Sequence, residues 1–198
     1  MRKGVLFVIS APSGAGKSSL IDKIRPLFPD MLYSVSCTTR LPRPNEVEGV
    51  HYYFVSRERF QEMIDKRQFL EWKEVHGNRY GTPAQPVIEA IRRGQRMILD
   101  IDVQGAAEVF KSFQQAVGIF ITAPDLTVLE QRLRTRGTDS EASIRTRMKN
   151  AEWELEQAKL FTYGIVNDDL SRAAEQLSSI IVKESEGSYD KPTREISR

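Results

Sequence analysis

The stretch SAPSGAGKSS at residues 10–19 places small residues, a lysine and hydroxyl side chains in one short bend. It follows an apolar run and leads into a segment with the pattern of an amphipathic helix. A loop that wraps a polyphosphate must bring backbone N–H groups close to the ligand, so it needs residues without bulky side chains. Gly14, Ala15 and Gly16 meet this need, and the helix start beside them offers unpaired N–H groups. The stretch therefore predicts a site for the phosphates of a nucleotide.

Two side chains of this loop are suited to act on the phosphates. Lys17 can reach the β- and γ-phosphates of a nucleotide, and the Ser18 hydroxyl can ligate Mg²⁺. The loop departs from the pattern G-x-x-x-x-G-K-[ST] at its first position, which is Ala11. The alternative is a glycine-rich turn without a ligand, which the combination of apolar strand, GAGKS and amphipathic helix disfavours. The residues expected to contact the nucleotide here, which the resemblance described below implies to be ATP, are Ala11, Pro12, Ser13, Gly14, Ala15, Gly16, Lys17, Ser18 and Ser19.

A loop of this kind needs an acidic residue beside it to hold the metal ion, and MILDID at residues 97–102 is an apolar strand that ends in carboxylates. Asp100 is the expected partner of Mg²⁺ or of its water shell. Asp102 should point the same way along the strand. An aspartate at this place can instead cap the helix that is expected to begin near Gln104.

Another group of residues is suited to bind a phosphate monoester. Arg40 and Arg43 lie on the proline-stiffened segment SCTTRLPRP, and Tyr52 and Tyr80 follow them. Guanidinium forks and phenol hydroxyls can hold such a phosphate by several hydrogen bonds. Surface arginines are common, so the spacing alone leaves an ordinary surface as the alternative.

Glu71, between Leu70 and Trp72, can accept two parallel hydrogen bonds. Guanine offers a matching pair of donors, its ring N1–H and its exocyclic amine, whereas adenine has an acceptor at N1. Glu71 therefore favours guanine, unless LEWKE is only the polar face of a strand.

The elements that must position these residues alternate between apolar runs and helical patterns, which predicts an α/β fold. We expect a P-loop NTPase-type five-stranded parallel sheet flanked by helices. Strands are expected at residues 5–9, 33–37, 97–101, 117–122 and 164–166. Helices are expected after Gly16 and at residues 86–93, 104–113, 125–136 and 170–181. A T-x-x-E capping box at Thr138 and Glu141 predicts a further helix that ends near Leu160.

Residues 38–83 interrupt this alternation. Prolines, glycines and the segments HYYFV and FLEWKEV, around a short helix near residues 60–64, predict an inserted small mixed α/β lobe. Residues 185–198 lack an apolar period and predict a loose C-terminal tail.

Composition excludes several classes of protein. With 40% hydrophobic residues the chain can bury a core, and no run approaches the ~20 apolar residues of a membrane span. A net charge of +2 is too small to argue for bulk binding of nucleic acid. The single cysteine, Cys37, cannot form an internal disulfide, which fits a cytoplasmic protein.

Several motifs occur in order along the chain: SAPSGAGKSS, SVSCTTRLPRPNEVEGVHYYFV, FLEWKEVHGNRYGT, ILDIDVQG, RLRTRG and IVNDD. On these motifs the chain resembles a guanylate kinase over roughly residues 4–183. The resemblance implies Mg²⁺-assisted transfer of the γ-phosphate of ATP to GMP, giving ADP and GDP in purine metabolism. It implies ATP, GMP and also dGMP as ligands, with neither nucleic acid nor a membrane as partner. Monomer and homo-oligomer both stay open.

The resemblance also implies roles for residues at matching positions. The GMP phosphate would be held by Arg40, Arg43, Tyr52 and Tyr80. The base would be read by Ser36, Glu71, Thr82 and Asp102, with the division of metal and GMP contacts between Asp100 and Asp102 left open. A helical lid would close over the transferring group with Arg132, Arg136 and Arg147, which act in catalysis together with Lys17, Arg40 and Asp100. Asn167 would contact adenine. For any single lid arginine, a solvated helix face is the alternative.

A single domain is expected, and the resemblance divides it into a core (residues 1–37, 84–131 and 161–184), a GMP-binding lobe (38–83) and a lid (132–160). Two other function classes would use the same loop. One is a P-loop kinase that acts on another phosphorylated acceptor, such as a sugar phosphate, and the complete acceptor set argues against it. The other is a catalytically inactive, guanylate-kinase-like module that binds proteins. Intact Lys17, Ser18 and Asp100 argue against that class.

Overall fold

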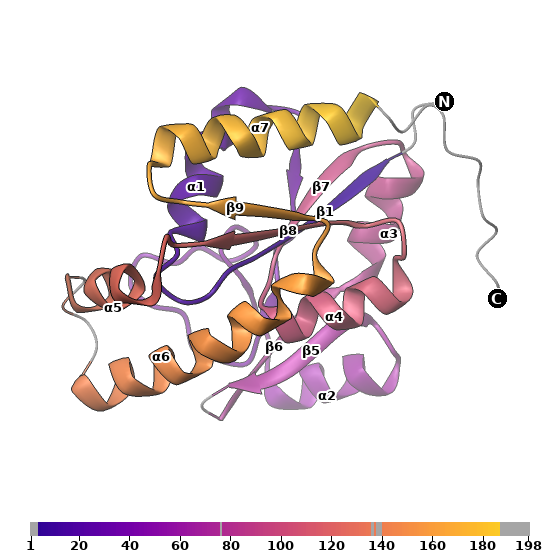
Figure 1. Cartoon of the computed structure of the whole chain (residues 1–198). Coiled ribbons are helices and arrows are strands. Elements are labelled where there is room, and N and C mark those ends of the chain that lie inside the picture. The colour runs from indigo at the N-terminus through magenta and orange to yellow at the C-terminus, as the bar shows by residue number, and fades with distance from the viewer. Residues whose placement is uncertain (1–3, 76, 136, 138–139, 187–198) are drawn as a thin grey trace.

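A parallel sheet in the strand order β2-β7-β1-β8-β9 forms the centre of the molecule (Figure 1). The structure, a computed structural model, describes residues 4–186 except 76, 136 and 138–139. The strands of this sheet are β1 (Val5–Ser10), β2 (Leu32–Tyr33), β7 (Arg96–Asp100), β8 (Val117–Thr122) and β9 (Tyr163–Val166). The predicted five-stranded parallel sheet is confirmed.

Helices cover both faces of this sheet (Figure 1). The central strand β1 is therefore buried along its whole length. Phe7 and Ile9 belong to a core cluster with residues of α1 (Lys17–Ile24), α5 (Leu126–Thr135), α6 (Glu141–Glu156) and α7 (Leu170–Glu186). Leu6 and Val8 belong to the opposite cluster, with α3 (Ala84–Arg92) and α4 (Val103–Ser112). Short 3-10 helices, η1 (Arg25–Leu27) and η2 (Gln157–Leu160), follow α1 and α6.

A smaller mixed sheet, in the order β4-β3-β6-β5, forms the lobe that interrupts the α/β alternation. Its elements are β3 (Cys37–Thr38), β4 (Tyr53–Phe54), β5 (Phe69–Val75), β6 (Asn78–Pro83) and the helix α2 (Arg57–Asp65). The buried ring of Phe60 in α2 stacks on Phe69 of β5, with ring centroids 4.5 Å apart. The predicted mixed lobe around a short helix is therefore confirmed.

The prediction of one strand over residues 33–37 is wrong. β2 and β3 belong to different sheets, because the chain crosses from the central sheet to the lobe between them. Ser34 still donates its N–H to the carbonyl of Ile98 in β7, at 3.0 Å, whereas the Ser36 carbonyl already accepts from Tyr53 of β4, at 2.9 Å. An apolar pattern alone does not reveal which neighbour a strand pairs with.

The predicted capping box is also wrong. α6 begins at Glu141, and its N-cap is Ser140, whose hydroxyl accepts a hydrogen bond from the Ser143 N–H at 3.3 Å. Ser140 is as suitable a cap as a threonine, and it lies directly before the helix. Thr138 lies outside the described residues.

The last helix, α7, continues to Glu186, so the start of the predicted tail at residue 185 is wrong by two residues. Residues 187–198 lie outside the described residues. Among the described residues, no helix combines the length and the apolar character that crossing a membrane requires.

Candidate active site

The loop between β1 and α1 has the backbone that a phosphate cradle requires. Gly14 and Gly16 have φ values of 94° and 85°, in the left-handed region that favours glycine. A Cβ at Gly16 would lie 2.4 Å from the Nδ2 atom of Asn167, so this position is closed to a side chain. The N-cap of α1 is Gly16, which has no side chain to accept a hydrogen bond from the first turn, so N–H groups at the helix start are left for an anion. Ala11 and Ala15 are buried in the core cluster beneath the loop.

Lys17 and Asp100 form an ion pair beside this loop. The Lys17 ammonium also donates to the carbonyl of Ile101 at 3.2 Å, so its charge is held at the carboxyl end of β7. Ser18 lines the same cavity of about 410 Å³ as Lys17 and Asp100. No group of three or more His, Cys, Asp or Glu side chains suited to a metal occurs in the described part of the chain. The hydroxyl and the carboxylate nevertheless fit Mg²⁺, which in nucleotide sites takes one or two protein oxygens and its other ligands from phosphates and water.

Glu71 lines this cavity and is in contact with Thr82. Thr82 donates its hydroxyl to Oε1 of Glu71 at 2.5 Å, and both side chains are buried. Burial raises the pKa of Glu71 above its ordinary value. The other predicted acceptor-site residues that line the cavity are Ser36, Tyr52, Tyr80, Asp100 and Asp102. The structure thus brings the candidates for base recognition and the candidate phosphate-binding residue, Lys17, to one cavity.

Asp102 does not continue the strand, because β7 ends at Asp100. The strand alternation expected for Asp102 is therefore wrong, and the helix cap that was its alternative is correct. Asp102 caps α4 by accepting a hydrogen bond from the Gly105 N–H at 2.9 Å. Its other oxygen forms an ion pair with Lys73 of β5.

Lys73 is a residue of the site that sequence reasoning missed. It lies two residues after Glu71 in β5, so both side chains project from the same face of the strand. Lys73 lines the cavity with Lys17 and Glu71 and also a neighbouring cavity of about 500 Å³ between the loop and α6. The alternation of side chains in FLEWKEV could have indicated this residue, because it places Lys73 on the same strand face as Glu71.

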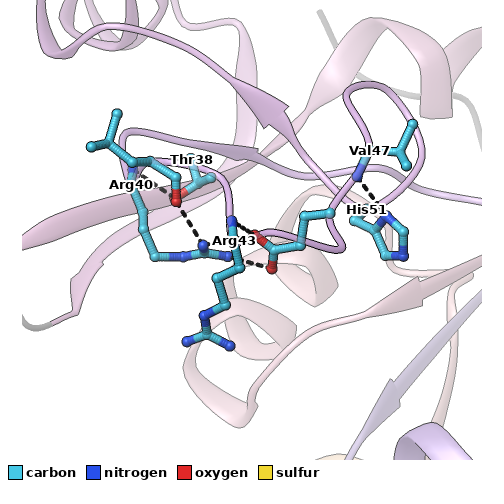
Figure 2. A network of polar contacts seen from close by, with 7 residues as sticks. Thr38, Arg40, Arg43, Val47 and His51 are labelled. Carbon is cyan, nitrogen blue, oxygen red and sulfur yellow. Dashed lines mark hydrogen bonds and ion pairs between the residues drawn. The ribbon is translucent and has the colours of Figure 1, made fainter.

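Arg40 and Arg43 lie on the loop that follows β3 (Figure 2). The Arg40 guanidinium donates to both carboxylate oxygens of Glu46, each at 2.8 Å, and lies over the ring of Tyr52 with 5.4 Å to the centroid. Glu46 also accepts the Arg43 N–H at 2.7 Å, while the exposed Arg43 guanidinium projects away from this network in Figure 2. The Arg40 fork lowers the pKa of Glu46 to about 2. Glu46 therefore holds both arginine positions, a role that no local motif indicated.

The lid candidates approach the loop from α5 and α6. Arg132 donates one guanidinium nitrogen to the Asn167 carbonyl at 2.8 Å, and its Nη1 atom is buried without a hydrogen-bond partner among the described residues. Arg147 donates to the Ser13 hydroxyl at 2.9 Å. Arg136 lies outside the described residues.

Asn167 is buried at the end of β9, and its side-chain amide donates to the Ala15 carbonyl at 2.8 Å. Gly14, Gly16, Ser19, Arg132 and Asn167 line a further cavity of about 510 Å³ beside the loop. Pro12 and Ser13 line the cavity between the loop and α6. The adenine contact expected for Asn167 stays a prediction.

Comparisons with known proteins agree with these motifs. Residues 3–184 match the family model described as guanylate kinase. The guanylate kinase of Carboxydothermus hydrogenoformans is 47% identical over 184 residues, which cover 93% of this chain and 90% of that protein. The guanylate kinase of Desulfitobacterium hafniense is 48% identical over 181 residues, or 91% and 90% of the two chains. A crystal structure of guanylate kinase from Anaplasma phagocytophilum matches with a TM-score of 0.73 at 32% identity, over 93% of this chain and 88% of that one. By sequence and by fold, the chain belongs to the guanylate kinase family.

Proposed function

We propose that the chain transfers the γ-phosphate of ATP to GMP, giving ADP and GDP. The observation that carries this proposal is the cavity of about 410 Å³, which Lys17 and Ser18 share with Glu71 and Tyr80. A donor phosphate on the loop and an acceptor phosphate in the lobe would meet in this space. Close approach of two bound reactants in a fixed orientation supplies a large part of the barrier reduction in such reactions.

The donor side of the reaction needs positive charge on the transferring group. Lys17 would act on the phosphates of ATP, and Arg132, Arg136 and Arg147 would place further charge against the equatorial oxygens. The buried, unpartnered Nη1 of Arg132 supports this role, because a guanidinium nitrogen without an acceptor is costly unless a ligand supplies one. Closure of the lid over residues 132–160 would exclude water and limit hydrolysis of ATP.

The acceptor side binds GMP by its phosphate and by its base. Arg40, Arg43, Tyr52 and Tyr80 would hold the phosphate. Ser36, Glu71, Thr82 and Asp102 would read guanine. None of these proposed contacts requires a 2′-hydroxyl, so we expect dGMP to be accepted as well.

Ser18 and Asp100 would hold Mg²⁺, partly through water. When bound, the ion would neutralise part of the negative charge of the donor phosphates. The ion pair between Asp100 and Lys17 supports this role, because it keeps the carboxylate next to the lysine proposed to act on the donor phosphates.

We also propose the cytoplasm as the compartment of the protein. Cys37 is 3% exposed, and burial raises the pKa of its thiol to about 11. A buried, protonated thiol is a packing residue rather than a nucleophile or a disulfide partner.

The function is tested by following ADP release with GMP, dGMP, AMP and sugar phosphates as acceptors. Turnover with GMP and dGMP alone is the expected result. Turnover with a sugar phosphate in place of GMP would identify another kinase of this fold. Binding of GMP without turnover of any acceptor would identify an inactive binding module.

A further inference from the structure

Gly105 has no backbone reason to be glycine. It is the third residue of α4 and is buried. It is not one of the described glycines that have a positive φ. Within a helix, glycine is less favourable than alanine by about 1 kcal/mol. The residue therefore weakens the start of α4 unless the missing side chain serves another purpose.

The space beside Gly105 is filled by Glu71. A Cβ atom built on Gly105 would lie 2.9 Å from Oε2, 3.1 Å from Cδ and 3.3 Å from Cγ of Glu71. All three nearest atoms belong to one side chain, which reaches across from β5 to α4. A contact under 3.0 Å forces the neighbour to move, so no side chain at residue 105 is compatible with the present position of the carboxylate.

The Glu71 carboxylate cannot move away from a Cβ without losing its other contact. Oε1 accepts the hydrogen bond from Thr82 at 2.5 Å, whereas Oε2 is the oxygen nearest to Gly105. Thr82 is fully buried, so a shift of Glu71 would leave its hydroxyl without an acceptor. Gly105 and Thr82 together fix the direction in which the carboxylate points.

We propose that Gly105 is a specificity-determining position of this enzyme, at which the absence of a side chain sets the placement of the Glu71 carboxylate and thereby the preference for guanine. This inference rests on the proposed reading of guanine by Glu71. Gly105 acts through Glu71 and is a positioning residue. In an alanine variant the N–H of residue 105 would still donate to the Asp102 carboxylate, because an added Cβ removes no backbone donor.

The test is Gly105→Ala, measured as the ratio of kcat/KM for GMP to kcat/KM for IMP, which lacks the exocyclic amine of guanine. We expect the ratio to fall about tenfold, because a displaced carboxylate loses its fit to the paired donors. Two effects on stability oppose each other, because alanine favours the helix whereas a displaced Glu71 leaves the buried Thr82 hydroxyl without its acceptor. We therefore expect the melting temperature to change by only a few degrees. A matched control is Gly164→Ala in β9, where a Cβ would meet nothing within 4 Å.

Glu71→Ala separates failure of this inference from failure of the proposed function. The variant removes all three atoms that a Cβ at residue 105 would meet, so Gly105→Ala should have no further effect in its background. An unchanged GMP-to-IMP ratio in Glu71→Ala would refute the reading of guanine by Glu71. A lowered ratio in Glu71→Ala but not in Gly105→Ala would overturn the inference alone. The inference would also be overturned if Gly105→Ala lowered the GMP-to-IMP ratio equally in the unmodified chain and in Glu71→Ala, or if it prevented folding of both proteins.

Discussion

The side-chain amide of Asn167 donates a hydrogen bond of 2.8 Å to the carbonyl of Ala15, inside the loop between β1 and α1. The backbone carbonyl of the same asparagine accepts a hydrogen bond from Arg132 at 2.8 Å. Asn167 is 4% exposed, so both bonds are shielded from water. One buried residue at the end of β9 therefore connects the loop to an arginine of the proposed lid.

Replacing Asn167 by alanine should disturb the loop rather than a single base contact. The Ala15 carbonyl would lose its buried donor, which lowers the free energy of unfolding by about 1–3 kcal/mol. We expect the KM for ATP and the KM for GTP as phosphate donor to rise by similar factors, while the KM for GMP changes little. Steady-state kinetics with both donors and denaturant unfolding measure this, with the exposed Asn45→Ala as control. A rise confined to ATP would instead establish the adenine contact that the family resemblance implies.

Lys17→Ala should lower kcat by orders of magnitude while GMP still binds. In the proposed function the ammonium acts on the donor phosphates, so its removal would take away charge that stabilises the transition state. Coupled ADP release gives kcat, and calorimetry gives the dissociation constant of GMP. Lys23→Ala is a matched control, because Lys23 lies in the same helix but contacts the exposed Ser171. Weakened GMP binding with normal turnover of ATP would contradict this role.

Glu71→Gln should reduce the preference for GMP over AMP by about 1–3 kcal/mol, because an amide must turn an NH₂ group toward one of the two guanine donors. The ratio of kcat/KM for the two acceptors measures this preference. Glu74→Gln, in the same strand but at a half-exposed carboxylate, serves as control. An unchanged ratio would remove Glu71 from base recognition.

The same substitution should alter how stability depends on pH. Burial raises the pKa of Glu71 above its ordinary value of 4.5, so the folded chain keeps a proton that the unfolded chain has released. The stability contributed by this group is complete below its unfolded pKa and is lost as the pH rises through the folded pKa. Glu71→Gln removes this loss.

Denaturant unfolding of both proteins between about pH 4 and pH 7 checks this expectation. The stability of Glu71→Gln relative to the unmodified chain should increase across this range. Burial also raises the pKa of Glu154, so the stability of both proteins still depends on pH in part through this residue. Parallel curves for the two proteins would show that Glu71 has the same pKa in the folded and unfolded states.

The pattern of neighbouring residues in the sequence was enough to predict the loop and the central sheet. It could not predict contacts between segments that lie far apart in the sequence. The loop was predictable because its glycines, lysine and serine are adjacent in sequence, and the covered parallel strands because each is an apolar run. The crossing from β2 to β3 was not predictable, because it depends on which neighbour pairs with Ser34 and Ser36. The contacts of Asn167 with Ala15 and of Glu71 with Gly105 likewise join segments far apart in sequence.

Lys73 is the remaining charged residue of the cavity for which the sequence offered no role. It pairs with Asp102, and burial lowers its pKa, with the charges of Glu71, Lys17 and Glu154 also acting on it. The ion pair joins β5 of the lobe to the start of α4 in the core, on the strand face that carries Glu71. Its loss would free both the lobe strand and the Asp102 carboxylate.

Lys73→Met keeps most of the side-chain stem and removes the charge. The side chains of the ion pair are partly exposed, at 32% for Lys73 and 27% for Asp102. We therefore expect the free energy of unfolding to fall by about 1 kcal/mol. Because this ion pair holds the lobe proposed to bind GMP, we expect the KM for GMP to rise by up to about fivefold, the factor for 1 kcal/mol of binding free energy, with a smaller change in the KM for ATP. Lys73→Arg should retain the pair and most of the affinity, and the exposed Lys66→Met in the same lobe should behave like the unmodified chain. If Lys73→Met leaves both the KM for GMP and the free energy of unfolding unchanged, the ion pair does not connect the lobe to the core in solution.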